Sequence, residues 1–355
     1  MERPRIAVAG TGWWSAGHHI PALAAYEGAE LVALCDPVVS RAQTLADRYH
    51  VPRVAARLDD VLAGGGVDGV VVATPHATHH ELARAALDAG AHVLVEKTMT
   101  TTAGDAFDLV TTAEKAGLHL AVGYTYQYAA TAEFARETVQ EAIGELVQVV
   151  AEFTSDTAGL FTAAETGAGG GPVDGMHPVS YSARLGGGQA HTQVTHVMGM
   201  VCWATGREVA DVVAFAERRG LEVDLDDVAA FRFAGGGTGT VASSGRGRHG
   251  VRHHVRYIGT EGVVDHDLLA ARVELRRADG SGLVRVPPAD EPPYPTTAPA
   301  RSFADLIAGR GPNHAPGRSA AAAVAFIEAM LTATESGRVV PVAPVPQPAD
   351  LDRRD

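Results

Sequence analysis

Arg5-Ile-Ala-Val-Ala-Gly-Thr-Gly-Trp-Trp-Ser15 is the stretch that decides the fold of this 355-residue chain. Its apolar half predicts a short buried strand that runs into G-x-G-x-x-S, a dinucleotide-binding fingerprint without its third glycine. Gly10 and Gly12 let the backbone approach a pyrophosphate, whose charge then lies at the N-terminus of the following helix. Ser15 in place of the third glycine indicates an altered helix–strand spacing and leaves the nucleotide site in place.

Short apolar runs and amphipathic stretches alternate over the first 124 residues. This alternation is typical of βαβ units and of a parallel, doubly wound sheet. We therefore predict an α/β fold with a Rossmann domain over residues 1–124. The predicted strands are 5–10, 31–35, 69–73, 92–95 and 118–122, and the predicted helices lie around 20–26, 41–49, 79–90 and 103–117.

Several of these strands end in residues that suit a nucleotide. Asp36 follows the second strand, 24 residues beyond Gly12, where its carboxylate can accept hydrogen bonds from a ribose 2′-hydroxyl and repel a 2′-phosphate. This favours NAD over NADP, unless Asp36 is only a turn residue before Pro37. Because the carboxyl ends of parallel strands meet at one edge, we expect a cofactor site there. Its predicted residues are Gly10, Gly12, Trp13, Trp14, Asp36, Thr74, Pro75, His79, Glu96 and Lys97.

Two features of this edge point to chemistry beyond binding. Lys97 is one of only two lysines, arginine supplying the other 27 of the 29 positive charges, and it ends a buried-looking strand. A lysine with a lowered pKa can give and take a proton, so we interpret Lys97 as catalytic. The alternative is a strand-end lysine paired with Glu96 or a phosphate. Of Trp13 and Trp14, we expect one to pack under the sheet and the other to lie beside the nicotinamide or the substrate.

The combination of motifs resembles the glucose–fructose oxidoreductase / inositol dehydrogenase / rhizopine catabolism (Gfo/Idh/MocA) family. The resemblance rests on the G-x-G turn, on Ala73-Thr-Pro75 with His79, and on Val93-Leu-Val-Glu96-Lys97. It implies a nicotinamide dinucleotide at the sheet edge, with Glu96 near the nicotinamide ribose. It also implies a lysine that binds and polarises the reacting oxygen of a sugar, cyclitol or related polyol. Finally, it implies a second-domain sheet that packs against partner subunits, in a homodimer or homotetramer.

Three positions depart from the family's pattern. Thr98 stands where proline would make the turn after the lysine rigid. Gln127 takes an arginine position, which removes a fixed positive charge and argues against a strongly acidic substrate. Thr192 replaces an aspartate four residues before the family's histidine, here His196, and threonine cannot act as a carboxylate base.

The second half of the site is expected on a helix over residues 189–203, where positions 189, 192, 193 and 196 share one face. We expect His196 to assist Lys97 in proton transfer, although a lone histidine on a helix is more often structural. The residues at 126 and 127 fit packing at the domain interface equally well. The predicted substrate contacts are Tyr126, Gln127, Thr192, Gln193 and His196.

Residues 125–340 predict an α+β domain with a mostly antiparallel, open sheet, and residues 341–355 a tail. A glycine-rich loop over 155–188 is expected beside the substrate or against another subunit, the alternative being a surface insertion. The arginines and histidines of the segment 246–256 could suggest a metal or phosphate site. Because they alternate with apolar residues, we predict instead that they form the polar face of a strand. The strands are expected at 146–153, 211–217, 228–233, 239–243, 253–258, 262–265 and 272–276, and the helices around 130–142, 301–309 and 319–335.

The composition excludes several classes of protein. A net charge of −13 argues against a nucleic-acid or anionic-membrane partner. Cys35 and Cys202 lie in apolar runs, which disfavours a disulfide framework. With no apolar run long enough for a membrane span and no secretory signal pattern, we expect a cytoplasmic protein. No Cys/His spacing indicates a metal site.

The sequence thus predicts an NAD(P)-dependent oxidoreductase acting on the hydroxyl or keto carbon of a sugar, cyclitol or sugar-derived metabolite. One alternative keeps NAD tightly bound and uses a transient ketone for epimerisation or glycoside cleavage. Another is a non-catalytic, nucleotide-sensing regulatory protein on the same fold.

Overall fold

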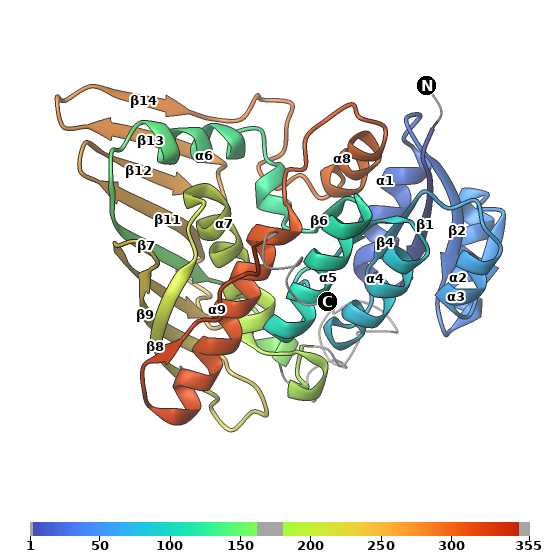
Figure 1. Ribbon diagram of the computed structural model, residues 1–355, viewed down its shortest axis with the longest axis horizontal. Coiled ribbons are helices and arrows are strands. Elements are labelled where there is room, and N and C mark those ends of the chain that lie inside the picture. Colours follow the sequence, from blue (N-terminus) through green and yellow to red (C-terminus); the bar gives the residue numbers. More distant parts are fainter. Residues whose placement is uncertain (1–2, 162–179, 348–355) are drawn as a thin grey trace.

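The computed structural model describes residues 3–161 and 180–347 and contains two sheets, each with its own helices (Figure 1). The first sheet has six parallel strands in the spatial order β3-β2-β1-β4-β5-β6, which is the doubly wound order of a Rossmann domain. The predicted α/β class is confirmed. The strands are β1 (Arg5–Ala9), β2 (Glu30–Cys35), β3 (Arg53–Ala55), β4 (Gly69–Val72), β5 (His92–Val95) and β6 (Leu120–Val122).

Two elements of this domain escape the sequence pattern. Strand β3 has only three residues, all partly buried, so it shows neither an apolar run nor clear alternation. Helix α3 (Leu58–Ala63) has six residues, fewer than two helical turns. The remaining elements are a π-helical turn (Ser15–His19), α1 (Ile20–Ala24), α2 (Val39–Tyr49), a 3₁₀ turn (His76–Thr78), α4 (His79–Asp88), α5 (Ala103–Ala116) and a 3₁₀ turn (Thr125–Tyr128).

The second sheet has nine strands in the order β14-β13-β12-β11-β7-β10-β9-β8-β15. Every neighbouring pair is antiparallel except β10 and β7, as expected for a mostly antiparallel sheet. The strands are β7 (Leu146–Thr154), β8 (Val209–Glu217), β9 (Asp226–Phe233), β10 (Thr238–Ser244), β11 (Arg252–Gly259), β12 (Gly262–Asp267), β13 (Arg272–Arg277), β14 (Gly282–Arg285) and β15 (Val340–Pro341).

Helices cover one face of this second sheet, on the side toward the Rossmann domain (Figure 1). Alternate residues of the inner strands β9 to β12 are buried beneath them, and β9 shows the pattern most clearly, whereas β14 at one edge is exposed throughout. Strand β11 shows the same alternation, so residues 252–256 of the segment 246–256 lie on a strand as predicted, whereas residues 246–251 precede the strand and that part of the prediction is wrong. The helices of this half are α6 (Ala132–Glu141), α7 (Thr195–Thr205), α8 (Ala298–Ile307) and α9 (Gly317–Ser336), with a π-helical turn (Ala190–Val194) before α7 and 3₁₀ turns at Ala158–Phe161 and Ala183–Leu185.

The two halves of the chain share their cores. Buried residues of α8 pack with the α1 and α2 side of the first sheet, where the ring of Phe303 lies 3.0 Å from the position that a Cβ on Gly69 would take. Residues 298–307 therefore cover the Rossmann sheet, although they lie more than 170 residues after residue 124 in the sequence. The division into domains at residues 1–124 and 125–340 stays a prediction, and residues 298–307 of the second part pack on the sheet of the first.

The predicted tail begins with packed residues. Strand β15 pairs with β8, and Val342 and Val345 are buried in the core, so the last described residues add an edge to the second sheet. Residues 348–355 of the predicted tail lie outside the described residues, as do residues 162–179 of the predicted glycine-rich loop.

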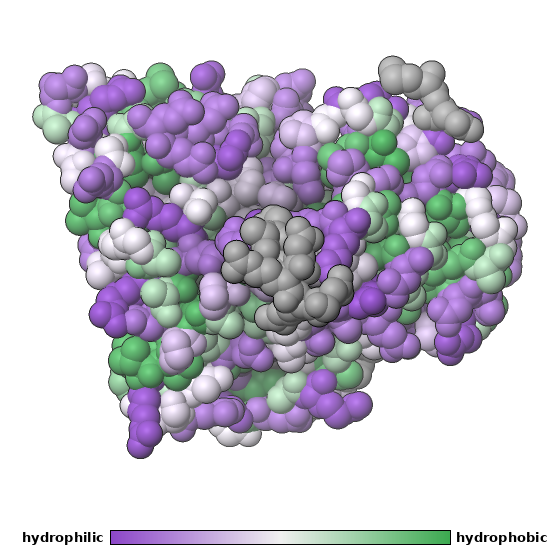
Figure 2. All heavy atoms as spheres, viewed as in Figure 1, coloured by the Kyte–Doolittle hydropathy of each residue, from purple (hydrophilic) through white to green (hydrophobic). Residues whose placement is uncertain are grey.

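Hydrophilic residues cover much of the face seen in Figure 2, with hydrophobic residues between them. None of the helices in the described part of the chain is long and apolar enough to cross a membrane.

Candidate active site

The glycine turn leaves space for a ligand at the carboxyl edge of the first sheet. Gly10 has a φ of +95°, and a Cβ there would lie 2.3 Å from the carbonyl oxygen of Ala73, so only glycine fits. A Cβ on Gly12 would meet no atom within 4 Å. The two glycines therefore do different work: Gly10 permits close packing against the end of β4, whereas Gly12 leaves open space beside the turn.

Asp36 lies where the sequence predicts it, buried at the end of β2 beside the glycine turn. Its carboxylate accepts hydrogen bonds from the backbone N–H of Thr11 at 2.9 Å, from the Thr11 hydroxyl at 2.7 Å and from the N–H of Val38 at 2.8 Å. These bonds hold a carboxylate at the position where a Rossmann domain contacts a ribose.

A second carboxylate, Glu96, collects three donors at the end of β5. It accepts from Trp14 Nε1 at 3.0 Å, from His19 Nε2 at 2.8 Å and from the backbone N–H of Lys97 at 3.1 Å. Burial opposes its ionisation, but the hydrogen bond and charge of His19, with help from Lys97, outweigh burial and lower the pKa of Glu96. The site therefore keeps a negative charge beside Lys97.

Trp13 and Trp14 both lie away from the sheet core, so the expectation that one packs under the sheet is wrong. Trp13 is 55% exposed. Trp14 is half-buried, and its indole N–H donates to Glu96. The π-helical turn that follows explains the arrangement, because it widens the helix start and brings His19 over Glu96. Sequence reasoning missed His19; its only signal was a histidine pair one turn beyond the fingerprint.

Lys97 is partly exposed and reaches across to the second domain. Its Nζ donates to the carbonyl oxygen of Thr192 at 2.9 Å. Burial lowers the pKa of Lys97, and the charge of Glu96 opposes this shift. Thr98, which follows through a cis peptide bond, is fully buried, and its hydroxyl lies 3.3 Å from that of Thr195.

His79 joins two strand ends instead of facing open space. It is fully buried, and its ring nitrogens lie 2.8 Å from the carbonyl oxygens of Thr74 and Thr98. The Thr74 side chain in turn lies against Gly10, since its Cγ2 is 2.9 Å from the position of an added Cβ. His79 thus positions the turns after β4 and β5, with Pro75 opening the first of them.

The predicted helix face of the second domain is reorganised by its π-helical turn. Thr192 meets Lys97 through its backbone, while its hydroxyl donates to Gly188 O at 2.6 Å. Gln189 turns toward the sheet and donates to Ser243 at 2.9 Å, and the Gln193 side chain is partly buried. The turn departs from the 3.6-residue spacing on which the prediction of one shared face rested, and that shared face stays a prediction.

His196 and Gln127 carry buried polar atoms without a partner among the described residues. His196 is buried, with Nδ1 unpartnered, and burial together with the charge of Lys97 holds its pKa well below the usual range. Gln127 is 2% exposed, and both atoms of its amide are unpartnered. Buried polar atoms of this kind call for a partner, which a polar ligand can supply.

An aromatic group surrounds His196. Tyr126 lies edge-on to it at 5.5 Å, and the Tyr126 hydroxyl is 2.6 Å from Nδ1 of His253. Phe153 stacks on His253 at 3.6 Å and lies parallel to His196 at 5.6 Å. Sequence reasoning missed Phe153 and His253, because they lie on strands β7 and β11 and nothing local marks either as part of a site.

The described end of the glycine-rich loop touches the Rossmann domain. Nδ1 of His76 lies 2.7 Å from the carbonyl oxygen of Gly186, and both groups are buried. A Cβ on Gly186, whose φ is +80°, would lie 2.5 Å from Thr101. Gly169 to Gly171, which carried part of the prediction for this loop, lie outside the described residues.

Comparison with known proteins places this geometry in a family. A family model described as "Oxidoreductase family, NAD-binding Rossmann fold" matches residues 4–124, and one described as "GFO/IDH/MocA C-terminal domain" matches residues 133–265. Among curated relatives, D-glucoside 3-dehydrogenase of Escherichia coli K12 is 32% identical over 49% of this chain. The match spans about half (51%) of that relative's length.

Two similarities extend over nearly the whole chain. dTDP-3,4-didehydro-2,6-dideoxy-alpha-D-glucose 3-reductase of Streptomyces violaceoruber is 27% identical, with 91% of each chain covered. The crystal structure of GenD2 from gentamicin A biosynthesis, in complex with NAD, is 28% identical with a TM-score of 0.76, covering 97% of each chain. Levoglucosan dehydrogenase in complex with NADH shares the fold with a TM-score of 0.80 at 17% identity. This chain belongs to the Gfo/Idh/MocA family of oxidoreductases with an NAD-binding Rossmann fold.

Proposed function

We propose that this protein is an NAD-dependent oxidoreductase acting on a CH–OH or keto carbon of a sugar, cyclitol or sugar-derived metabolite. The observation that carries the proposal is Lys97. Its amine lies between the Rossmann edge and the second domain, bonded to Thr192 O and beside the ionised Glu96. A lysine held between a nucleotide edge and unpartnered polar groups is suited to exchange a proton with a substrate oxygen.

The residues at the sheet edge fit a nicotinamide dinucleotide. Gly12 leaves open space beside the helix start, which suits a pyrophosphate, and Asp36 supplies an acceptor for a ribose hydroxyl. A negative charge at Asp36 repels a 2′-phosphate, which supports NAD over NADP. When bound, the nicotinamide supplies the acceptor or donor of hydride. Trp14 and Glu96 would border it, with Thr74, Pro75 and His79 shaping the edge.

The chain's own residues divide the remaining work. Lys97 donates to, or accepts a proton from, the reacting oxygen, and Thr192 O orients its amine. His196 offers Nδ1 to a substrate hydroxyl, and its lowered pKa keeps the ring neutral, so it can accept a hydrogen bond or a proton there. Gln127 offers a neutral amide in the family's arginine position. Tyr126 and Gln193 are proposed to complete the substrate wall.

Absorbance of the reduced nicotinamide, recorded while sugars and cyclitols are screened with each coenzyme, tests the function. We expect NADH formation with at least one polyol and a kcat/KM at least about tenfold higher with NAD than with NADP. In Asp36→Ala the ratio of kcat/KM with NAD to kcat/KM with NADP should be smaller. Turnover of substrate without net NADH would favour the redox-neutral alternative. Coenzyme binding without any turnover would favour a regulatory protein and overturn the proposal.

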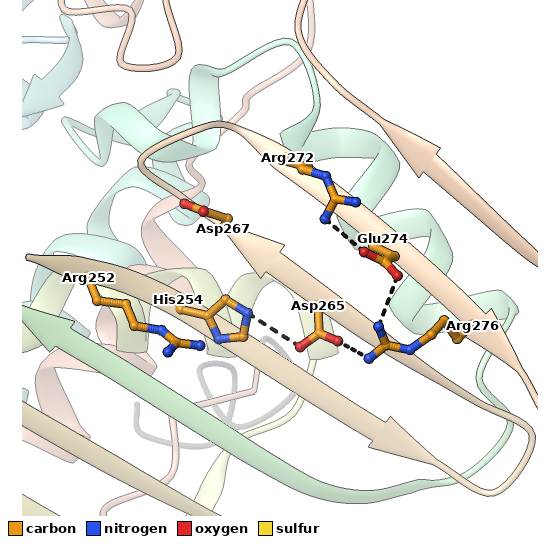
Figure 3. Close-up of a pocket in the computed structure, with 7 residues that line it drawn as sticks. All are labelled: Arg252, His254, Asp265, Asp267, Arg272, Glu274 and Arg276. Atoms are coloured by element: carbon orange, nitrogen blue, oxygen red, sulfur yellow. Dashed lines mark hydrogen bonds and ion pairs between the residues drawn. The ribbon is translucent and has the colours of Figure 1, made fainter.

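The outer face of the second sheet supports association with a second copy of the chain. Phe215 is 72% exposed there and pairs across strands with Val228, which is 48% exposed. Beyond β7 the face becomes charged. Figure 3 shows Arg and Asp/Glu side chains of β11 to β13 pointing toward one another, around a cavity of about 390 Å³. A face that exposes apolar side chains on β8 and β9, together with ion pairs on the same strands and on β11 to β13, is suited to a two-fold, self-complementary interface.

Phe215→Glu is expected to break this interface. A carboxylate buried between two sheets without a partner is strongly unfavourable, so the molar mass measured by light scattering should fall toward the 36.8 kDa of one chain. Ala24→Glu, an exposed change on α1 of the other domain, is the control and should leave the mass unchanged. An unchanged mass in Phe215→Glu, or a monomeric parent protein, would contradict an oligomer built through this sheet.

The cytoplasm is the compartment we propose, and it is supported by two buried free cysteines, Cys35 and Cys202.

A further inference from the structure

His253 is held from two sides at the inner face of the second sheet, and only 9% of it is exposed. It lies on β11 opposite Phe153 of β7, and the two rings stack with their centroids 3.6 Å apart and their planes 12° from parallel. The hydroxyl of Tyr126, on the 3₁₀ turn before α6, lies 2.6 Å from its Nδ1. A neighbouring strand and a turn of the other domain therefore fix the position and the orientation of this ring.

The hydrogen bond with Tyr126 decides which nitrogen of His253 carries the proton. Burial lowers the pKa of His253 to about 4, so the ring is neutral near neutral pH and has one N–H. Burial also raises the pKa of Tyr126, so the phenol keeps its hydrogen.

Two arrangements of these hydrogens can be compared. If the phenol donates to Nδ1, the N–H of the ring is at Nε2, and this one donor has no partner among the described residues. If Nδ1–H donates to the phenol oxygen, both the phenol hydrogen and the lone pair of Nε2 are left without a described partner. The second arrangement costs more, because each buried polar group without a partner is unfavourable. Nε2 of His253 is therefore the protonated nitrogen.

The N–H at Nε2 of His253 is one of several buried polar groups that call for a partner near Lys97. Nδ1 of His196 and the amide of Gln127 also lack one among the described residues. The tyrosine and the phenylalanine that contact His253 also lie beside His196. The charges of Lys97 and His253 both act on His196. The donor of His253 therefore lies close to the groups that are proposed to move the proton.

The polar side chains nearest Lys97 already have partners within the protein. The Thr192 hydroxyl donates to the carbonyl oxygen of Gly188, and the Thr192 carbonyl accepts from Lys97. The charge of Glu96 acts on Lys97, and this carboxylate already accepts three hydrogen bonds from Rossmann residues. The groups that stay unpartnered near them are neutral, and the N–H of His253 has a direction that the protein fixes.

We propose that His253 is a specificity-determining residue of the substrate site, whose Nε2–H donates to a substrate oxygen other than the reacting one. Tyr126 is its positioning residue, because the phenol fixes both the ring and the nitrogen that carries the proton. This rests on the proposed oxidoreductase function and adds to it the polarity of one contact. A donor at this place recognises a hydroxyl, ether or carbonyl oxygen, whereas a carboxylate would recognise only a hydroxyl that donates.

Deoxy analogues of the best polyol, each lacking one hydroxyl that does not react, test the contact in the full-length protein. In the parent, loss of the contacted oxygen should lower kcat/KM by about 10–10²-fold, because a buried donor is left without a partner. In His253→Leu the donor is absent, so that analogue and the complete polyol should have similar kcat/KM values. If His253→Leu discriminates against every deoxy analogue as strongly as the parent does, the proposal is overturned.

Two further variants separate the hydrogen bond from damage to the fold. His253→Gln keeps an N–H donor on a side chain of similar length and should retain part of the discrimination. Tyr126→Phe keeps the ring but frees His253, so it should lower kcat/KM for the complete polyol more than for the deoxy analogue. If His253→Leu does not fold, discrimination that is unchanged in both of these variants overturns the proposal.

His266→Leu is the matched control. His266 is a buried histidine on β12, burial lowers its pKa to about 4, and its Nδ1 has no partner among the described residues, but it lies outside the aromatic group around His196. Its replacement removes the same kind of buried neutral ring and should leave the discrimination unchanged. An equal loss of discrimination in His266→Leu would assign the effect to the core and contradict the role of His253.

The same assay separates this proposal from the function on which it rests. No turnover with any polyol would overturn the oxidoreductase function, and the role of His253 with it. Turnover of a polyol with discrimination that does not depend on His253 would overturn the role of His253 alone.

Discussion

Lys97→Ala is expected to lower kcat by about 10²–10⁴ while the affinity for NAD changes little. The amine is bonded to Thr192 O and lies beside Glu96, so it faces the junction of the two domains rather than the glycine turn. Its removal takes away the proton donor and acceptor but leaves the glycine turn and the Asp36 carboxylate in place, and these two are proposed to hold the pyrophosphate and a ribose. Steady-state kinetics with the best polyol, and calorimetric titration with NAD, measure the two quantities separately.

The chain supplies its own control for this experiment. Lys115, the only other lysine, is exposed near the end of α5, and Lys115→Ala should leave kcat and NAD affinity unchanged. Lys97→Arg keeps a positive charge that cannot be lost near neutral pH, so it should restore little activity to oxidation. Retention of more than a tenth of the parent kcat in Lys97→Ala would assign proton transfer to another group.

The dependence of kcat/KM on pH tests the protonation state in which Lys97 acts. Oxidation requires Lys97 to be neutral, and burial lowers its pKa, so kcat/KM for oxidation should rise with pH and level off below the range of an ordinary lysine. Lys97→Ala should lose this rise.

Asp227→Asn is expected to stabilise the protein at pH 7–8. Asp227 is buried on β9, and both carboxylate oxygens lack a partner among the described residues. Burial, then the charge of Asp224, raises its pKa well above the usual range. Each unit by which the folded pKa exceeds the unfolded one costs about 1.4 kcal/mol of folding free energy at pH values above both. Asparagine cannot ionise and escapes this cost.

The sign follows from proton binding. With a raised pKa the folded state holds the proton more tightly, so its stabilising effect is complete below the unfolded pKa of about 3.9 and is lost as pH rises through the folded value. Urea unfolding between pH 5 and 8.5 should therefore show a falling free energy of unfolding in the parent and a flatter curve in Asp227→Asn. An identical slope in both proteins would contradict the assignment.

The adjacent residue is the matched control with the opposite sign. Asp226 is bonded to Ser244 at 2.6 Å and paired with Arg246; although burial opposes ionisation, these partners lower its pKa. Its contribution is therefore present above the unfolded pKa and is lost as pH falls through the lowered folded value. Asp226→Asn should destabilise the protein slightly at neutral pH, the effect of an exposed pair being small.

Local sequence predicted the Rossmann half of the site because its residues lie at strand ends. Gly10, Asp36, Thr74 and Lys97 each follow a buried strand, and parallel strands bring their carboxyl ends to one edge whatever the details of packing. The family resemblance added the histidine at position 196. These inferences needed only periodicity and short motifs.

The contacts between segments escaped the sequence for two physical reasons. His19 and Thr192 lie within the π-helical turns that precede α1 and α7, where α-helical spacing does not apply. His19 there bonds Glu96, and the carbonyl of Thr192, not its side chain, accepts from Lys97. The pairing of Tyr126 with His253 depends on strand register over more than a hundred residues. Neither a helical period nor a motif carries that information.

The position of α8 has a consequence for synthesis on the ribosome. One face of the Rossmann sheet is completed by buried residues of α8, which are translated long after β6. A nascent chain that has emerged only to residue 124 therefore exposes part of the apolar side of β4 and β5. The first domain to be made must wait for nearly the last helix, so truncated chains should bind chaperones or aggregate.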